Sequence, residues 1–176
     1  GYTIRMKVLH QGGSIKVGHQ QITVEGADEA TVFYTVDTEY SPVYPLYKGE
    51  KPRQTTEKTI KSAITKGYET VKHTHISDYQ TLYNRVKFTL SGDTASEKLP
   101  TDIRVKQLQQ GFTDDASLKV LWFNLSRYLL ISASRPGTLP SNLQGVWNTF
   151  EKAPWNGNFQ SNINLQEMYW GCGPTQ

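Results

Sequence analysis

The chain has 176 residues, with 19 basic and 16 acidic side chains and a net charge of +3 that is not concentrated in any block. A nucleic-acid surface would show a clustered basic stripe, and a membrane span would need about 18 consecutive apolar residues. The sequence has neither, so we expect no nucleic-acid partner and no membrane partner. The single cysteine, Cys172, excludes an intrachain disulfide and gives no sign of a structural zinc site.

The first forty residues predict β structure. Four short segments are rich in β-branched and aromatic residues or alternate apolar with polar side chains, as strands do. Four strands of this length cannot close a sandwich core alone, so we expect further strands from elsewhere. The predicted strands are residues 2–9, 14–17, 21–25 and 31–36.

The next segments predict a change from strands to helices. Residues 41–52 are rich in proline and tyrosine and predict an irregular connection. From Thr55 the apolar period is helical, and Gly67 is placed to end that helix. Residues 68–86 predict a second amphipathic helix. Residues 86–90 alternate again and predict one strand that returns to the sheet.

The polar segment 91–97 is the best candidate for a domain boundary, and the chain beyond it predicts helices. Pro100 and Thr101 mark one helix start, and Asp114 and Asp115 open the next, where acidic residues complement the helix dipole. Two or three helices cannot cover the apolar surface of that second helix, so we expect a fragment of a larger fold. The main apolar stripe of this second helix consists of Leu118, Leu121, Trp122, Leu125 and Leu129.

Residues 134–170 combine indole rings, side-chain amides, glycine and proline with few charges. Amides donate to and accept from hydroxyl groups, and indole rings offer large amphipathic faces. This composition is typical of a site for a neutral, polyhydroxylated ligand, so a carbohydrate is the expected ligand class.

The run 128–148, followed by residues 153–155 and 162–170, resembles glycoside hydrolase family 95, which holds bacterial α-L-fucosidases and some α-L-galactosidases. Shorter segments fit in the same order along the chain, so the resemblance covers essentially all of it. The resemblance implies a bacterial, secreted or periplasmic enzyme, of which this chain is a middle fragment. The shorter segments are residues 24–30, 66–68, 78–86 and 99–102.

The resemblance also implies a fold class, an α+β multidomain fragment. Residues 1–50 are expected to be the C-terminal strands of a β-super-sandwich domain. Residues 51–98 are expected to form a helical linker with the returning strand. Residues 99–176 are expected to be the N-terminal part of an (α/α)6 catalytic barrel. The remaining domains of the same polypeptide would then be partners of this chain.

Members of the family invert the anomeric centre, which requires an acid and an activated water on opposite faces of the sugar. The resemblance implies that Asn162 and Asn164 are catalytic and position that water. The general-acid Glu and the polarising Asp would lie beyond Gln176, since Glu151 and Glu167 do not match the acid position. The isolated chain should therefore hydrolyse nothing. No cofactor is expected.

The expected substrate is a fucosylated oligosaccharide or glycan with a terminal α-L-fucosyl group. Gln160 matches a position near the C5 substituent of the sugar, which leaves fucose and L-galactose both open. Arg135 is expected to form a structural ion pair. No metal site is expected, because His73 and His75 lie on different faces of their helix. The other candidate substrate-binding residues, which can equally hold the loop or the core, are Asn142, Gln144, Trp147, Trp155 and Trp170.

Two alternatives stay open. One is a catalytically inactive carbohydrate-binding or structural homologue, which the residues at the family's acid and base positions would distinguish. The other is a module that folds alone, which would have to bury Leu121, Leu125 and Leu129 without a partner. We expect self-association through those residues instead, because large exposed apolar faces promote it.

Overall fold

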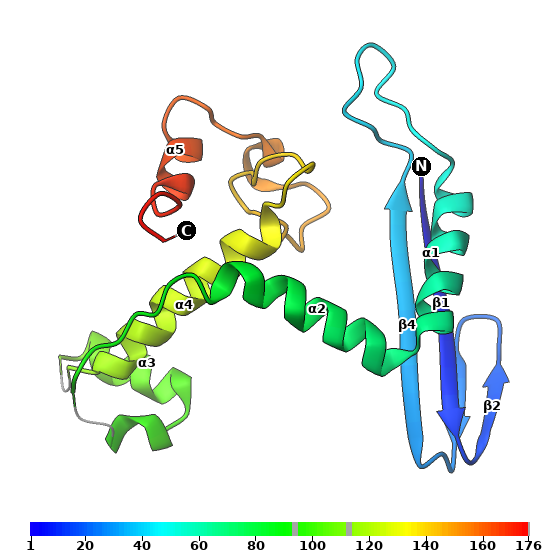
Figure 1. Ribbon diagram of the computed structural model, residues 1–176, viewed down its shortest axis with the longest axis horizontal. Coiled ribbons are helices and arrows are strands. Elements are labelled where there is room, and N and C mark those ends of the chain that lie inside the picture. Colours follow the sequence, from blue (N-terminus) through cyan, green and yellow to red (C-terminus); the bar gives the residue numbers. More distant parts are fainter. Residues whose placement is uncertain (93–94, 112–113, 176) are drawn as a thin grey trace. The chain divides into compact units, whose positions relative to one another are not determined.

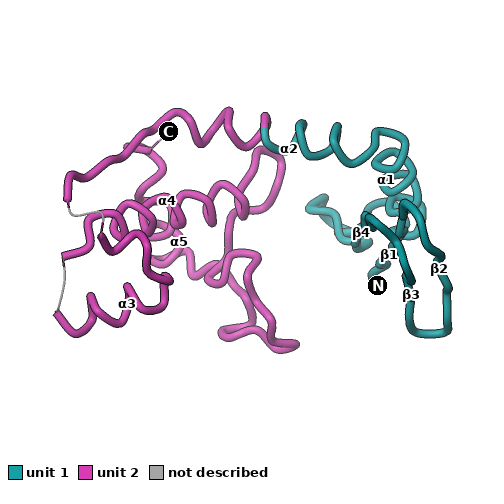
Figure 2. Tube along the Cα trace, turned by 90° about the horizontal axis from the view of Figure 1, so that it is seen from below, with its two compact units in different colours: residues 1–76 teal, residues 77–176 magenta. Residues whose placement is uncertain are grey.

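The computed structural model describes residues 1–92, 95–111 and 114–175. The chain divides into two compact units, Gly1–Ile76 and Ser77–Gln176, shown in teal and magenta in Figure 2. The structure contains a small amount of antiparallel sheet and several helices, which agrees with the α+β class. The β-super-sandwich, the (α/α)6 barrel and the division at residues 50 and 98 stay predictions. None of the described helices is long and apolar enough to cross a bilayer.

The first unit is built on antiparallel strands. β1 (Tyr2–Gln11) pairs with β4 (Glu29–Thr38) over its full length, and β2 (Ser14–Val17) pairs with β3 (Ile22–Glu25). The four predicted strands are therefore confirmed, and both outer strands are longer than expected. Since β2 and β3 lie between β1 and β4 in the sequence, the four strands form two nested hairpin ladders.

Glycines separate the two ladders. Gly12 and Gly13 both have positive φ, at 66° and 63°, so the chain turns there through a conformation that residues with a Cβ rarely adopt. At Gly13 the backbone of the opposite strand also comes very close. A Cβ on Gly13 would lie 2.2 Å from the carbonyl oxygen of Glu25 and 2.5 Å from the amide nitrogen of Ala27. The sequence signal Gly12-Gly13 thus marks the point where one ladder ends and the next begins.

We expect Gly13→Ala to lower the free energy of unfolding by about 3 kcal/mol, because a left-handed backbone strain adds to a backbone clash. The matched control is Gly111→Ala. Gly111 also has positive φ, at 72°, but open space surrounds the position of its missing Cβ, so only the backbone strain of about 1 kcal/mol remains. Urea unfolding of both variants measures the difference. An equal loss of unfolding free energy in both variants would contradict the close approach of the Glu25 backbone to Gly13.

Helix α1 (Pro52–Lys66) covers one face of the β1–β4 ribbon, as Figure 1 shows. Thr56 and Ile60 are buried in that contact, and the Thr55 hydroxyl donates a hydrogen bond to the carboxylate of Asp37 on β4. The helix begins at a proline and ends at Gly67, whose amide donates to the carbonyls of Ala63 and Ile64. The predicted end of this helix is confirmed.

The opposite face of the same ribbon is apolar and exposed in this chain. Ile4 lies opposite Val36, and Met6 lies opposite Tyr34. All four side chains are more than half exposed. The strands therefore alternate as predicted, but the face with the larger apolar side chains is the one that α1 does not cover.

Helix α2 (Tyr68–Tyr83) begins in the first unit and ends in the second. The segment 86–90 is extended and pairs with no strand among the described residues, so its return to the sheet stays a prediction. Its contacts are with a helix instead. Phe88 packs against Phe123 with ring centroids 4.7 Å apart, and the carbonyl of Val86 accepts from Arg127. The alternation of apolar and polar residues in this segment therefore arises because one side of it packs against a helix and not against a sheet.

The second unit is helical. After a 3-10 turn, η1 (Ala95–Lys98), come α3 (Thr101–Gln109) and α4 (Ala116–Ala133), which meet near the N-terminal end of α4. A 3-10 turn, η2 (Pro154–Gly157), and a short helix, α5 (Asn164–Tyr169), follow. The helix starts predicted at Thr101 and after Asp115 are confirmed.

A buried ion pair joins α3 to the start of α4. The guanidinium of Arg104 donates two hydrogen bonds of 2.8 Å to the carboxylate of Asp115, and both residues are buried. Asp115 also caps α4 by accepting from the amide of Leu118, while the Ser117 hydroxyl binds the same carboxylate. Arg104 and the other hydrogen bonds hold the pKa of Asp115 far below its ordinary value, despite the opposing effect of burial.

Most of the apolar stripe on α4 is uncovered in this chain. Leu118 is buried at 3% exposure, whereas Leu121, Trp122 and Leu125 are between 42% and 65% exposed. A module that folds alone would have to bury these side chains, so the arrangement does not favour that alternative.

Candidate functional site

The predicted site residues lie in one segment, residues 134–163, in the short helix that follows it, and at Trp170 directly after that helix. Figure 1 shows this segment as loops beyond the C-terminal end of α4, whereas α3 lies at the other end of that helix. Backbone hydrogen bonds close the segment on itself. The amide of Leu143 donates to the carbonyl of Asn158, and the amide of Leu165 donates to the carbonyl of Gln160.

The structure brings Asn142, Gln144 and Gln160 into this folded segment, where all three are half-buried. The Asn142 side chain accepts from the amide of Gln144, and the side-chain amide of Gln144 donates to the carbonyl of Pro154. Gln160 donates to the side chain of Asn158 at 2.7 Å. Each of the three side chains therefore makes a hydrogen bond that holds the segment together.

The candidate tryptophans differ in their surroundings. The Trp147 ring lies 6.1 Å from the ring of Tyr128 on α4, tilted by 32°, and is about half exposed. Trp155 and Trp170 are 71% and 73% exposed. Such exposed indoles offer free faces to a ligand or to another part of a larger protein.

The backbone around Trp155 is strained. Trp155, Asn156 and Gly157 have consecutive positive φ values of 49°, 56° and 63°, and Gln160 follows at 47°. Non-glycine residues in this conformation cost roughly 1–2 kcal/mol each, and such strain concentrates at functional sites. The segment just before Asn162 is thus held in a conformation that local preference does not favour.

Asn162 lies in the turn just before α5, Asn164 is the first residue of that helix, and both are exposed. Neither side chain forms a hydrogen bond within the described residues, so both carboxamides are free to bind a solvent molecule or a ligand. Asn164 is the first residue of the helix, and Ile163 precedes it with no capping side chain. Of the predicted amide side chains, these two are the ones that form no hydrogen bond within the described residues.

Arg135 forms the structural ion pair expected from the sequence. One nitrogen of its guanidinium lies 2.6 Å and 2.5 Å from the two carboxylate oxygens of Asp78 on α2. This pair fixes the beginning of the candidate segment to a helix that is 57 residues away in the sequence. Asp78 had no assigned partner in the sequence analysis.

The sequence analysis did not single out Tyr169, which ties α5 to the preceding loop, or Arg127, which ties α4 to distant backbone carbonyls. The Tyr169 hydroxyl accepts from the amide of Ser141 and donates to the hydroxyl of Ser134. The buried guanidinium of Arg127 donates to four carbonyls, those of Leu82, Tyr83, Val86 and Thr175. In the sequence, Arg127 could have been noticed as a charged residue within a largely apolar helical pattern.

No metal site is formed among the residues that the structure describes, since no three His, Cys, Asp or Glu side chains are grouped to hold an ion. Glu151 and Glu167 are both exposed. Burial raises the pKa of the Cys172 thiol, which keeps it protonated at neutral pH.

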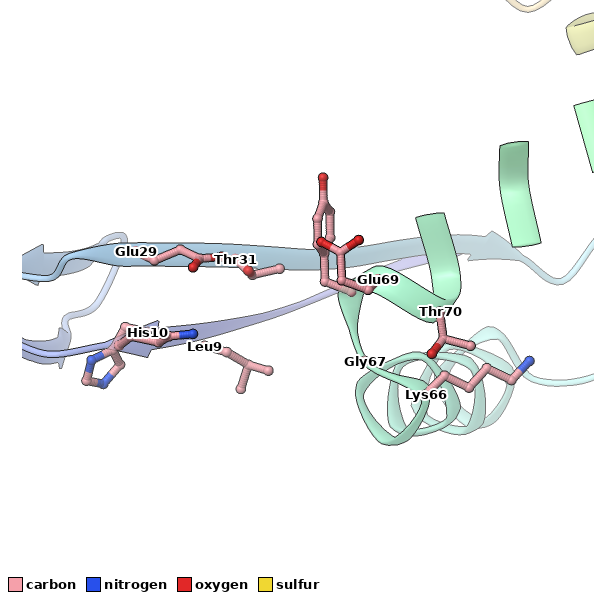
Figure 3. Close-up of a pocket in the computed structure, with 10 residues that line it drawn as sticks. Leu9, His10, Glu29, Thr31, Lys66, Gly67, Glu69 and Thr70 are labelled. Atoms are coloured by element: carbon pink, nitrogen blue, oxygen red, sulfur yellow. The ribbon is translucent and has the colours of Figure 1, made fainter. Parts of the chain in front are cut away.

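A separate cavity of about 460 Å³ lies in the first unit (Figure 3). His10 on β1, Glu29 on β4 and Lys66 at the end of α1 are among the side chains around it. None of the predicted site residues lines this cavity. Its mixed charges and open form do not resemble the amide-rich segment 134–163.

The sequence profile of the glycosyl hydrolase family 95 catalytic domain matches residues 67–176, which include the whole candidate segment. The chain belongs to this family. A "Probable alpha-fucosidase A" of Aspergillus niger is 35% identical over 157 residues, which cover 86% of this chain and 20% of that protein. "Alpha-L-fucosidase 2" of Arabidopsis thaliana is 35% identical over 175 residues, which cover 97% of this chain and 21% of that protein.

Family membership confirms the prediction of a family 95 glycoside hydrolase sequence that was based on residues 128–170. The chain spans about a fifth of the length of these two relatives. Both are eukaryotic, from a fungus and a plant, so the bacterial origin expected for this chain stays a prediction.

Proposed function

We propose that this family 95 chain is part of an inverting exo-glycosidase that removes terminal α-L-fucosyl residues from glycans. Asn162 and Asn164 hold the attacking water, and the general-acid Glu and the polarising Asp lie in parts of the full-length protein outside this chain. The family match and the relatives named as fucosidases support the reaction class. L-Galactose is the second candidate sugar, because Gln160 takes a position expected near the C5 substituent.

The observation that carries the proposal is the state of the two carboxamides at the start of α5. They are exposed and make no side-chain hydrogen bond within the described residues, while Asn142, Gln144 and Gln160 are engaged in loop contacts. An amide oxygen is a weak base alone. It can accept a proton of water in a hydrogen bond and aim the oxygen lone pair, and a nearby carboxylate strengthens that interaction.

We also propose that the two units belong to larger domains of one polypeptide. The uncovered apolar face of β1 and β4 fits a β-super-sandwich, and the uncovered stripe of α4 fits an (α/α)6 barrel. The relatives are about five times longer than this chain, which leaves ample sequence for both domains. Secretion or a periplasmic location is part of the proposal and rests on the family resemblance.

We expect the full-length protein to release β-L-fucose as the first-formed anomer from an α-L-fucosyl oligosaccharide, as inversion requires. Proton NMR in the first minutes, before mutarotation, identifies the anomer. The matching L-galactosyl substrate is tested in parallel, and the purified 176-residue chain serves as the control that should release nothing. If the α anomer forms first, the inverting mechanism is overturned. If the full-length protein releases no sugar, an inactive carbohydrate-binding homologue is favoured.

A further inference from the structure

We propose that Tyr169 is a positioning residue that places the water-binding amides of Asn162 and Asn164, at the N-terminal end of α5, relative to the sugar-facing loop 134–160. This inference rests on the proposed function. Its basis is the pair of hydrogen bonds made by one phenolic hydroxyl. The hydroxyl oxygen accepts from the backbone amide of Ser141 at 2.8 Å, and the hydroxyl donates to Ser134 Oγ at 2.6 Å.

Helix α5 needs such a tie because it cannot hold its own orientation. It has six residues, buries none of them completely and has no capping side chain. Helices this short are unstable alone, and packing or external bonds must fix them. Among the described residues, the Tyr169 hydroxyl makes the only side-chain hydrogen bonds from α5 to a distant part of the chain, over 28 and 35 residues.

The two partners of Tyr169 lie at the ends of one loop. Ser134 directly follows the last turn of α4, and its amide donates to the carbonyl of Leu130. Ser141 is buried at 6% exposure and precedes Asn142. The phenol therefore binds the end of a long helix and the start of the amide-bearing loop at the same time.

This arrangement couples the two groups of predicted site residues. Asn164 lies five residues before Tyr169 in the same helix, or about 7.5 Å along its axis at about 1.5 Å per residue. A rotation of α5 about its contact with the loop would move Asn164, and with it the adjoining Asn162, away from a sugar that the loop holds. Since misplacement of about 1 Å can lower a rate by up to about 100-fold, loss of the phenol should act on turnover.

The test uses the full-length enzyme with Tyr169→Phe, which removes only the hydroxyl oxygen. We expect kcat to fall about 10-fold while KM changes less than about 2-fold, because the sugar contacts remain and the alignment of the water is lost. Ser134→Ala removes one of the two hydrogen bonds and should lower kcat by a smaller factor, whereas Ser134→Thr keeps the hydroxyl and should keep wild-type turnover. The double variant Tyr169→Phe with Ser134→Ala should be no worse than Tyr169→Phe alone, since that substitution already removes the bond to Ser134. Tyr44→Phe, at a tyrosine that is 79% exposed, is the control.

The outcomes separate this inference from the proposed function. If Asn164→Ala abolishes turnover and Tyr169→Phe leaves kcat within 2-fold of wild type, Tyr169 does not position the amides, and the proposed function stands. A parallel rise in KM and fall in melting temperature for Tyr169→Phe, with Ser134→Thr no more active than Ser134→Ala, would also overturn the inference, because it indicates a purely structural role. If Asn162→Ala and Asn164→Ala both keep wild-type turnover, the proposed function itself fails.

Discussion

Replacing Asn162 or Asn164 with alanine in the full-length enzyme should lower kcat on an α-L-fucoside by about 10²–10⁴-fold, the range expected when the group that orients or accepts the proton of a nucleophile is lost. KM should change little, because the amides are proposed to hold the water rather than the sugar. Initial rates with a substrate that has a good leaving group measure both constants. Removing both amides should cost about as much as removing one, since they act on the same molecule of water.

A matched control is Gln109→Ala, which removes an exposed amide from α3. That helix lies at the opposite end of α4 from the candidate segment (Figure 1). Its turnover should match that of wild type. Wild-type kcat in the double variant Asn162→Ala with Asn164→Ala would show that the water is held elsewhere.

Loss of the buried Arg104–Asp115 pair should have the largest effect on stability. We expect Asp115→Ala to lower the free energy of unfolding by about 3–5 kcal/mol, because it leaves the buried Arg104 guanidinium without its counter-charge. The change also removes the cap of α4. Urea unfolding of the full-length protein measures the loss.

The neighbouring residue provides the comparison for that experiment. Asp114 has a carboxylate that is 81% exposed and pairs with Lys119 at the surface. Asp114→Ala should change the free energy of unfolding by less than about 0.5 kcal/mol, as exposed ion pairs contribute little. Equal losses for the two variants would mean that the buried pair does not hold α3 against α4.

The same pair predicts how stability depends on pH. The Arg104 guanidinium lowers the folded-state pKa of Asp115, so the folded state binds this proton less readily than the unfolded state does. The stabilisation is therefore complete above the ordinary unfolded pKa of about 3.9 and is lost as the pH falls below it towards the lowered value. The urea midpoint of the wild type should fall more steeply between about pH 4 and pH 2.5 than that of Asp115→Ala.

Local patterns predicted much of the fold but not its long-range contacts. The four strands, the glycine that ends α1 and the acidic residue that caps α4 all depend on neighbours within a few residues, and the structure confirms them. The segment 86–90 alternates like a strand but packs on α4 through Phe88, because a half-buried extended segment has the same pattern whether a helix or a sheet covers it.

The candidate site shows the same limit. The sequence indicated an ion pair at Arg135, but its partner Asp78 is 57 residues away, and no local pattern connects them. Tyr169 was part of the family-like run 162–170 without an assigned role, since the partners of a phenol cannot be known before the chain folds back on itself. The pairing of Gln144 with Pro154 was hidden for the same reason.

The four carbonyl contacts of Arg127 have a consequence for the order of folding. They join α4 to segments that are 41 to 48 residues away on both sides in the sequence. Closing loops of that length costs chain entropy before any contact is gained, so these bonds form after the local turns of the helices. We therefore expect the backbone amides of residues 164–175 to exchange with deuterium earlier than those in the middle of α4, which would make the nucleophile-binding end of the chain the first part to open under mild denaturant.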